Sequence, residues 1–403
     1  MGAYSNLLKT PGVARIIAAQ LTARFPFGML SLAFLLHVEH NTGSYAAAGL
    51  VLAATSVGQA ISGPLTSRWM GVWGMRPVLM LTLSICVVSL VVFALAPLTL
   101  PFYMVVGFIA GLSVPPVQPA VRTIYPKMVN SSQLTPLFSL DASAQEIIWV
   151  AGPVITTFVG TQINTVYAIL LAALFLIGGG TWFIASPEVG RVRIPTSKRS
   201  FGKVLTRPTV LLSTVTGFLL IGTCSAVEAG VISAFGNGSP NSGFVLAVFA
   251  IGSLGGGLVL GHLPVSPWSL PVRMAIVFVG IALTVIIPTS FVWLCVTLLI
   301  AGIGIAPALA VMFAIISSSV RFSDTAEAYG WAGTGQLIGA AIGSAIAGVL
   351  IDRTGAVGGL SVATAFALVG ILVPLVFKRV LPDLRGSDAS PLADTEPVPI
   401  QTS

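Results

Sequence analysis

The sequence predicts an all-α membrane protein with twelve transmembrane helices, six in each of two halves. Three observations predict this class: the composition, the length of the apolar segments and the distribution of the basic residues. The 403-residue chain is 55% hydrophobic and only 8% charged, and its mean hydropathy is +0.99. A soluble domain carries about 25% charged residues, and one with this composition would expose too much apolar surface to stay dispersed. Lipid is therefore the expected solvent.

Each apolar segment is long enough to cross a bilayer, because a spanning helix needs roughly 20 largely apolar residues. Backbone polar groups must be satisfied within the segment in lipid, which favours helices, and alternating barrel strands would be shorter and less uniformly apolar. By the length rule the spans are about 13–37, 45–66, 77–98, 101–123, 134–161, 164–185, 209–233, 242–262, 271–290, 291–315, 326–351 and 357–379.

The basic residues define the two sides of the membrane. The short loops on one side hold Lys9, Arg68, Arg76, Arg122, Lys127, Arg273, Arg321, Lys378 and Arg379. The long 186–207 connection on that side is basic as well, whereas the opposite loops hold only Arg353. Positive residues stay in the cytoplasm, so we expect both termini inside and a multi-pass protein of the cytoplasmic (inner) membrane. Topology thus explains the net charge of +7, and no basic face with interleaved aromatics indicates nucleic-acid binding.

The polar 186–207 stretch divides the membrane region into two similar halves. The expected organisation is an N-terminal half of six spans at 10–185, a cytoplasmic linker at 186–208, a C-terminal half of six spans at 209–380 and a disordered cytoplasmic tail at 381–403, whose composition is rich in Pro, Asp and Ser. Glycines recur four residues apart, a spacing that lets helix backbones approach closely in lipid. These are Gly107 and Gly111, Gly252 and Gly256, and Gly335, Gly339 and Gly343.

No metal or cofactor site is expected. The three cysteines lie within predicted spans, where single cysteines act as small apolar residues. His37 and His40 lack a third ligand. The sequence contains no phosphate-binding loop and no His-Glu-x-x-His motif, so ATP hydrolysis and metal-dependent intramembrane catalysis are not indicated. An ion gradient is the expected energy source.

Two local motifs resemble those of a known transporter family. The loop after span two reads GPLTSRWMGVWGMRPVL at 63–79, and Gly63, Arg68, Gly74 and Arg76 match the loop 2–3 motif of the major facilitator superfamily. The aspartate of that motif has no counterpart, since Ser67 or Gly71 stands there. Gly152-Pro153 in span five resembles the core of the family's antiporter motif. The resemblance covers about residues 10–380. It implies that each half, 10–185 and 209–380, is a six-helix bundle and that substrate binds between the two bundles near mid-membrane.

Four ionisable residues deep in the spans are candidates for function, because a charge in lipid usually faces a partner or a water-filled cavity. They are Arg24 in span one, Asp141 and Glu146 in span five, and Glu228 in span seven. Asp141 and Glu146 lie about 140° apart on a helix, so they cannot both point into one cavity. We expect Glu146 to face the cavity, or Arg24 across it, and Asp141 to face Arg122 at the end of span four.

Each expected pair has a structural and a functional interpretation. Asp141 and Arg122 form either a fixed ion pair at the inner end of the spans or a protonation switch. Glu146 and Arg24 form either a static pair or a protonation switch, since burial and a nearby arginine have opposite effects on carboxyl ionisation. The candidates for proton coupling are therefore Glu146, Arg24 and Asp141. Glu228 either recognises a cationic substrate or lies near the membrane interface.

Polar and aromatic residues in the spans are candidates for lining the substrate cavity, and charged residues at the cytoplasmic helix ends for an inner gate. The cavity candidates are Phe27, Gln118, Gln145, Trp149, Glu228 and Gln336. The gate candidates are Arg68, Arg76, Arg122 and Glu327, with Glu327 expected to meet Arg321 or Arg68.

The function predicted from these features is secondary active transport of a small amphipathic molecule by alternating access, in the form of proton-coupled export. The alternative is an uptake carrier or facilitator for a polar metabolite such as a sugar. The expected partners are a small-molecule substrate, protons and the bilayer, and the expected state is a monomer. The sequence leaves the substrate, the transport direction and the coupling ion open.

Overall fold

The computed structural model describes residues 2–197, 200–236, 239–385 and 389–394, and these are almost entirely helical. The N-terminal half contains α1 (Gly2–Lys9), α2 (Val13–Arg24), α3 (Phe27–Thr42), α4 (Tyr45–Trp73), α5 (Met75–Leu95), α6 (Leu100–Leu112), α7 (Val117–Ile124), η1 (Tyr125–Lys127), α8 (Ser131–Gln162) and α9 (Thr165–Ala185). The connection carries α10 (Pro187–Arg191) and η2 (Lys203–Thr206). The C-terminal half contains α11 (Pro208–Phe235), α12 (Pro240–Leu260), α13 (Ser269–Thr284), α14 (Phe291–Ser319), α15 (Phe322–Thr354), α16 (Ala356–Val376) and η3 (Lys378–Val380).

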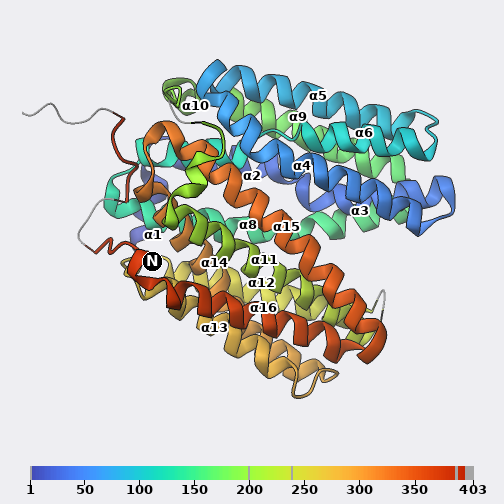
Figure 1. Cartoon of the computed structure of the whole chain (residues 1–403). Coiled ribbons are helices and arrows are strands. Elements are labelled where there is room, and N and C mark those ends of the chain that lie inside the picture. The colour runs from blue at the N-terminus through green and yellow to red at the C-terminus, as the bar shows by residue number, and fades with distance from the viewer. Residues whose placement is uncertain (1, 198–199, 237–238, 386–388, 395–403) are drawn as a thin grey trace, which may run out of the picture.

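The helices group into two bundles that follow the order of the chain (Figure 1). Among the described residues, 11 segments are long and apolar enough to cross a membrane. The remaining predicted span corresponds to α13, which has 16 residues. At 1.5 Å per residue α13 is about 24 Å long, somewhat short of the roughly 30 Å hydrocarbon core. The predicted class, an all-helical membrane protein of two bundles, is therefore confirmed.

Two predicted spans are each broken into two helices at prolines. In span one, α2 ends at Arg24 and α3 begins at Phe27, with Pro26 between them. In span four, α6 ends at Leu112 and α7 begins at Val117 after consecutive prolines. Proline lacks an N–H and fixes φ, so it interrupts the helical hydrogen-bond ladder. The break in span one leaves Arg24 on the last turn of a helix, where the negative helix end favours a cation.

The close approach of α3 and α8 requires glycine on both helices. A Cβ added to Gly152 would lie only 2.7 Å from the carbonyl carbon of Gly28, and a Cβ on Gly28 would collide with the backbone of Ile148. Backbone contact of this kind is available to glycine because it has no side chain. Gly152, the glycine of the Gly152-Pro153 motif, thus sets the distance between the first and fifth spans.

The four-residue glycine spacings also mark close helix contacts, as predicted. A Cβ on Gly111 would strike the α4 backbone at Thr55, and one on Gly256 would strike α14 at Ile303. Likewise, a Cβ on Gly343 would strike α11 at Gly222. Small residues at these positions therefore hold neighbouring spans at backbone distance in both halves.

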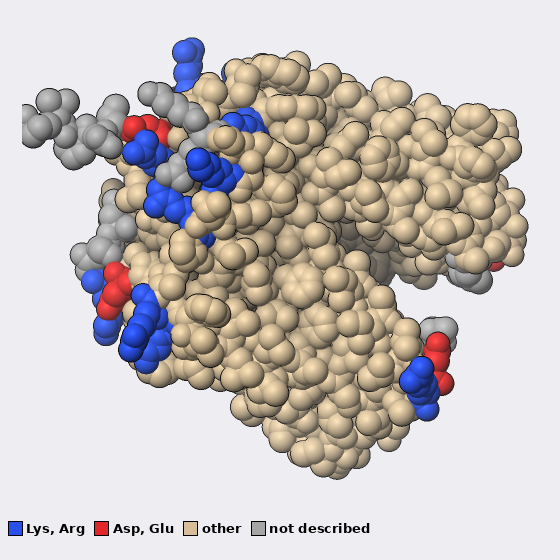
Figure 2. All heavy atoms as spheres, in the orientation of Figure 1, with Lys and Arg blue, Asp and Glu red and all other residues tan. Residues whose placement is uncertain are grey.

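The molecule has two unlike ends. Lys and Arg gather at one end in the view of Figure 2, which we call the basic end. The α4–α5 turn, the connection between the halves, α1 and the tail segment 389–394 lie there (Figure 1). At the opposite, distal end, a hollow separates the two halves (Figure 2). The cleft between the bundles is therefore open distally and closed at the basic end.

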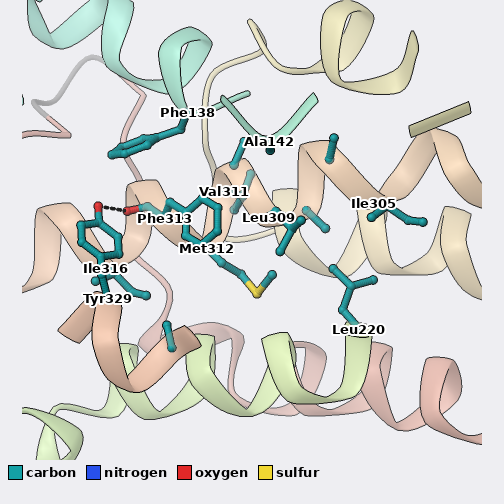
Figure 3. Packing of buried hydrophobic residues seen from close by; sticks show 14 of the residues in the cluster. Phe138, Ala142, Leu220, Ile305, Leu309, Val311, Met312, Phe313, Ile316 and Tyr329 are labelled. Carbon is teal, nitrogen blue, oxygen red and sulfur yellow. Dashed lines mark hydrogen bonds between the residues drawn. The ribbon is translucent and has the colours of Figure 1, made fainter. Parts of the chain in front are cut away.

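Aromatic packing closes the basic end between the halves. Phe138 of α8 lies with its ring centroid 6.3 Å from Phe313 of α14 and 6.3 Å from Tyr329 of α15. The Tyr329 hydroxyl donates to the Phe313 carbonyl oxygen at 3.0 Å, which fixes the ring orientations (Figure 3). All three side chains are almost completely buried, so a continuous apolar contact joins the bundles here.

The tail differs from the expected disorder where the structure describes it. Leu392 accepts from the Phe322 N–H at 3.0 Å and donates to the Val320 carbonyl at 2.9 Å. The Asp394 carboxylate accepts from the Ser323 N–H at 3.1 Å, at the start of α15. Helix N-termini carry unpaired N–H groups that favour such acceptors. The tail segment 389–394 therefore packs against the start of α15 despite its polar composition.

We expect Gly152→Ala to lower the free energy of unfolding by about 1–3 kcal/mol, because the new methyl group must push α8 away from Gly28. The measurement is the apparent Tm of purified protein in detergent. Gly178→Ala is the matched control, since a Cβ there meets no atom within 4 Å. An unchanged Tm for Gly152→Ala would contradict the importance of this contact.

Candidate functional site

A buried carboxylate, Asp141 of α8, lies at the centre of the N-terminal half. Its Oδ1 accepts from Gln20 Nε2 at 2.9 Å and from Arg24 Nη1 at 3.3 Å. Its Oδ2 accepts from Arg122 Nε at 3.2 Å. The side-chain exposures of Arg24, Arg122 and Asp141 are 3%, 3% and 0%. One carboxylate thus joins cations from α2 and α7 to α8, and we call these three residues the buried charge cluster.

Glutamines complete the hydrogen bonding of the two arginines. Arg24 donates to the Gln20 Oε1 at 2.7 Å and to the carbonyl oxygen of the Gln145 side chain. The side-chain oxygen of Gln118, in the amide orientation that satisfies both groups, accepts from Arg122 at 2.7 and 2.6 Å. Buried charges are tolerated when they are paired and hydrogen-bonded. Gln118 and Gln145, expected in the cavity, therefore serve the charge cluster, and both remain half-buried.

Arg122 also connects the cluster to the other half. Its guanidinium carbon lies 3.4 Å from the ring centroid of Phe313 on α14. A guanidinium over an aromatic face gains electrostatic attraction, more so when both are desolvated. The expected contact between Asp141 and Arg122 is present, and it sits directly against the aromatic closure of the basic end.

The second carboxylate of α8, Glu146, faces the C-terminal half. Its Oε1 accepts from the Ser253 hydroxyl of α12 at 2.7 Å. Asp141 and Gln145 are four residues apart and share the face toward α2 and α7. Glu146 lies on a different face, about 140° from Asp141. The half-buried Glu146 therefore sits at the interface between the bundles.

The expected pairing of Glu146 with Arg24 is wrong. Arg24 pairs with Asp141 instead. Arg24 is the last residue of α2, and the end of α2 packs against the face of α8 that carries Asp141 and Gln145. Of the described residues, none that is basic is among the groups that act electrostatically on Glu146. Glu146 is thus a carboxylate with a hydroxyl partner and no counter-ion.

Glu228 lies on the exposed side of α11 and shares that helix with Cys224, one turn earlier. Cys224 is within electrostatic range of both Glu146 and Glu228. This face of α11 is therefore directed toward α8 across the space between the halves. No described basic residue acts on Glu228.

The other cavity candidates occupy varied positions. Phe27 is half-buried at the start of α3, next to the break that follows Arg24. Trp149 is 53% exposed on α8. Gln336 of α15 is half-buried and packs against Gly217 of α11. The structure brings Gln118 and Gln145 to one cluster but leaves Trp149, Phe27 and Gln336 apart from it.

An ion pair and the linker hold the basic end of α4 and α15 together. Arg68 Nη1 donates to the Glu327 Oε2 at 2.6 Å, the contact expected from the sequence. The other carboxylate oxygen of Glu327 accepts from the Gly202 N–H of the linker at 2.7 Å. Ser197 of the linker donates to Asp324 at 2.5 Å. The connection between the halves is thereby part of the closure.

Arg76 differs from the other gate candidates. It donates to the carbonyl oxygens of Ile184 at 3.1 Å and Ser186 at 3.3 Å, both in the N-terminal half. Arginine near a helix C-terminus satisfies carbonyls that lack intrahelical partners. Arg76 therefore braces the end of α9 and does not bridge the two halves.

Sequence analysis missed the polar contacts between α8 and α12. The Ser139 hydroxyl donates to the Gly257 carbonyl at 2.7 Å, and the Ser143 side chain packs against the same glycine. Ser139, Ser143 and Glu146 share one helical face, and they meet Ser253 and Gly257 on α12. We call this contact the α8–α12 seam. The spacing of its small residues was the available signal.

Two helical bundles with buried charges beside a cleft are typical of membrane transporters. The family model of the Major Facilitator Superfamily matches residues 16–287 and 227–401. The chain belongs to this superfamily, and it is therefore a transporter and not an enzyme. A comparison with curated proteins found no match.

Solved structures with the same fold transport different molecules. The human organic anion transporter MFSD10 has a TM-score of 0.70 at 15% identity, over 90% of this chain and 98% of that one. The proton:xylose symporter XylE, bound to 6-bromo-6-deoxy-D-glucose, gives 0.70 at 14%, over 94% and 97%. A bacterial homologue of the iron transporter ferroportin in the outward-facing state gives 0.72 at 12%, over 91% and 99%. At these identities the likeness concerns the fold.

We expect Asp141→Asn to destabilise the protein by about 3–5 kcal/mol, because it leaves two buried arginines without a counter-charge. The apparent Tm should fall steeply. Asp352→Asn, at an exposed position near the distal end of α15, is the control for losing a carboxylate. Equal Tm values for the two variants would contradict a structural role of the cluster.

Proposed function

We propose that the protein exports a small amphipathic molecule across the cytoplasmic membrane in exchange for protons, with Glu146 as the group that carries the proton. The basic end would face the cytoplasm, because positive residues stay on that side. The cleft, open at the distal end, would then face outward.

The observation that carries this proposal is the difference between the two carboxylates of α8. Asp141 has three side-chain donors, two of them cationic, in a site closed to solvent. Glu146 has one neutral donor and lies where the halves meet. Asp141 is held by two ion pairs that join three helices, whereas Glu146 can gain or lose a proton without breaking an ion pair. Asp141 and Arg24 would therefore stay fixed through the cycle while Glu146 changes charge.

The proposed direction of coupling is antiport, and the resemblance of Gly152-Pro153 to the family's antiporter motif supports it. From an outward-open cleft a proton would reach Glu146 from outside, and after the cleft reopens to the cytoplasm it would leave there. Exchange of that proton for substrate gives export. The spans supply few Asn, Gln and Trp near their centres, which favours an amphipathic substrate over a sugar.

Two named neighbours support parts of the proposal. The symporter among them is coupled to protons, and the human neighbour transports organic anions. Proteins with this fold carry out both activities. Neither proton coupling nor transport of an organic solute would therefore require additional domains in this chain.

We expect Glu146→Gln to abolish proton-driven transport while leaving substrate exchange, because glutamine keeps the shape and cannot change charge. A thermal-shift screen of amphipathic cations, sugars and amino acids selects the probe. Proteoliposomes then report its movement with an imposed pH gradient, and its counterflow without one.

Glu39→Gln is the matched control, since Glu39 lies near the distal end of α3, away from the seam. It should retain proton-driven transport. Undiminished pH-driven accumulation by Glu146→Gln would remove Glu146 from the coupling role. Protection by sugars alone would favour the uptake alternative.

A further inference from the structure

The α8–α12 seam runs from the basic end toward the cleft, and Glu146 is its last polar contact. Along α8 the contacts are Ser139, Ser143 and Glu146, in that order from the basic end. Opposite them on α12 lie Gly257 and, one turn nearer the cleft, Ser253. Ser253 is 1% exposed. The seam thus closes the interface between the bundles at the basic end. The Glu146–Ser253 hydrogen bond lies at its inner limit, next to the open cleft.

Opening the basic end requires this seam to part. Alternating access moves one bundle against the other around a central site, and α8 and α12 belong to different bundles. The Ser139 bond ends on a backbone carbonyl, so its strength does not depend on proton uptake. The Ser253 bond ends on a carboxylate. A hydrogen bond to an ionised acceptor is roughly twice as strong as one between neutral groups.

Few titratable residues lie near Glu146 among the described residues. From α11 the titratable group in range is Cys224, with Glu228 one turn farther. Within α12 and α14, which pack on α8, the one titratable residue is Cys295, near the distal end of α14. Arg24 and Asp141 lie on the other face of α8 and are engaged with each other. Ser253 is the one described side chain that hydrogen-bonds to Glu146.

We propose that Ser253 is the positioning residue that couples the charge of Glu146 to closure of the basic end, an inference that rests on the proposed proton role of Glu146. Ionised Glu146 holds the seam shut through the Ser253 hydroxyl and keeps the protein outward-open. Protonation weakens that bond and releases α8 from α12, so the basic end opens once the proton has arrived.

The test measures the outward-open to inward-open ratio of the full-length chain as a function of pH. Spin labels on Thr42→Cys and Thr354→Cys, exposed at the distal ends of α3 and α15, report the width of the cleft mouth. The native cysteines are replaced by alanine, and the protein is held in lipid nanodiscs without substrate. Lowering the pH from about 8 to about 4, close to the ordinary pKa of a glutamate carboxyl, should reduce the ratio up to about fivefold.

Ser253→Ala should abolish this pH response, and Ser253→Thr, which keeps the hydroxyl, should restore it. Ser139→Ala is the matched control on the same seam. It should lower the ratio by the same factor at every pH, because its acceptor does not titrate. A merely structural role of Ser253 would give the Ser139→Ala pattern and would overturn the inference.

The proposed function and the inference fail in different ways. A flat pH response in the otherwise unaltered labelled protein, matching that of Glu146→Gln, would refute proton coupling through Glu146 itself. If the labelled protein without further substitutions shows the pH response and Ser253→Ala keeps it, the role of Ser253 is refuted while proton coupling through Glu146 stands.

Discussion

The N-terminal half depends on burying one aspartate between two arginines in a hydrocarbon environment. Asp141 can be charged there because Arg24 and Arg122 reach it from separate helices and because glutamines take up the remaining donors. Removing Asp141 would leave two arginines without a counter-charge in a medium of low dielectric. The breaks at the prolines of spans one and four and the glycine contact of α3 with α8 all place side chains for this cluster.

Helix α8 contacts its own bundle with one face and the other bundle with another. Asp141 and Gln145 bind it to its own bundle, while Ser139, Ser143 and Glu146 contact the other bundle. The Arg122–Phe313 contact lies beside the aromatic closure and the Arg68–Glu327 pair completes it. The buried charge cluster thus fixes α8 in its own bundle beside its contacts with the other bundle.

The sequence predicted the ion pairs that burial in lipid requires. It did not predict the contacts that depend on how the helices bend and pack. Charges in a bilayer have few partners, so the contacts of Asp141 with Arg122 and of Glu327 with Arg68 could be anticipated. The partner of Arg24 could not, because the side of α8 that the end of α2 meets depends on the bend at Pro26. The role of Ser253 was missed because a serine in a span usually bonds its own helix, and its four-residue spacing from Gly257 indicates close packing without naming a partner. The tail at 389–394 was missed because its packing depends on backbone groups of α15, not on its composition.

The sequence distance between Arg24 and its counter-ion bears on how the chain is made. Asp141 follows Arg24 by 117 residues, which a ribosome adds in roughly 6 to 23 s at ordinary synthesis rates. During that interval the first span must enter the bilayer with an unmatched cation, at about 2.5–3.5 kcal/mol on the translocon scale. The early spans therefore cannot settle into their final arrangement until the fifth has been inserted, and biogenesis of this half has a built-in order.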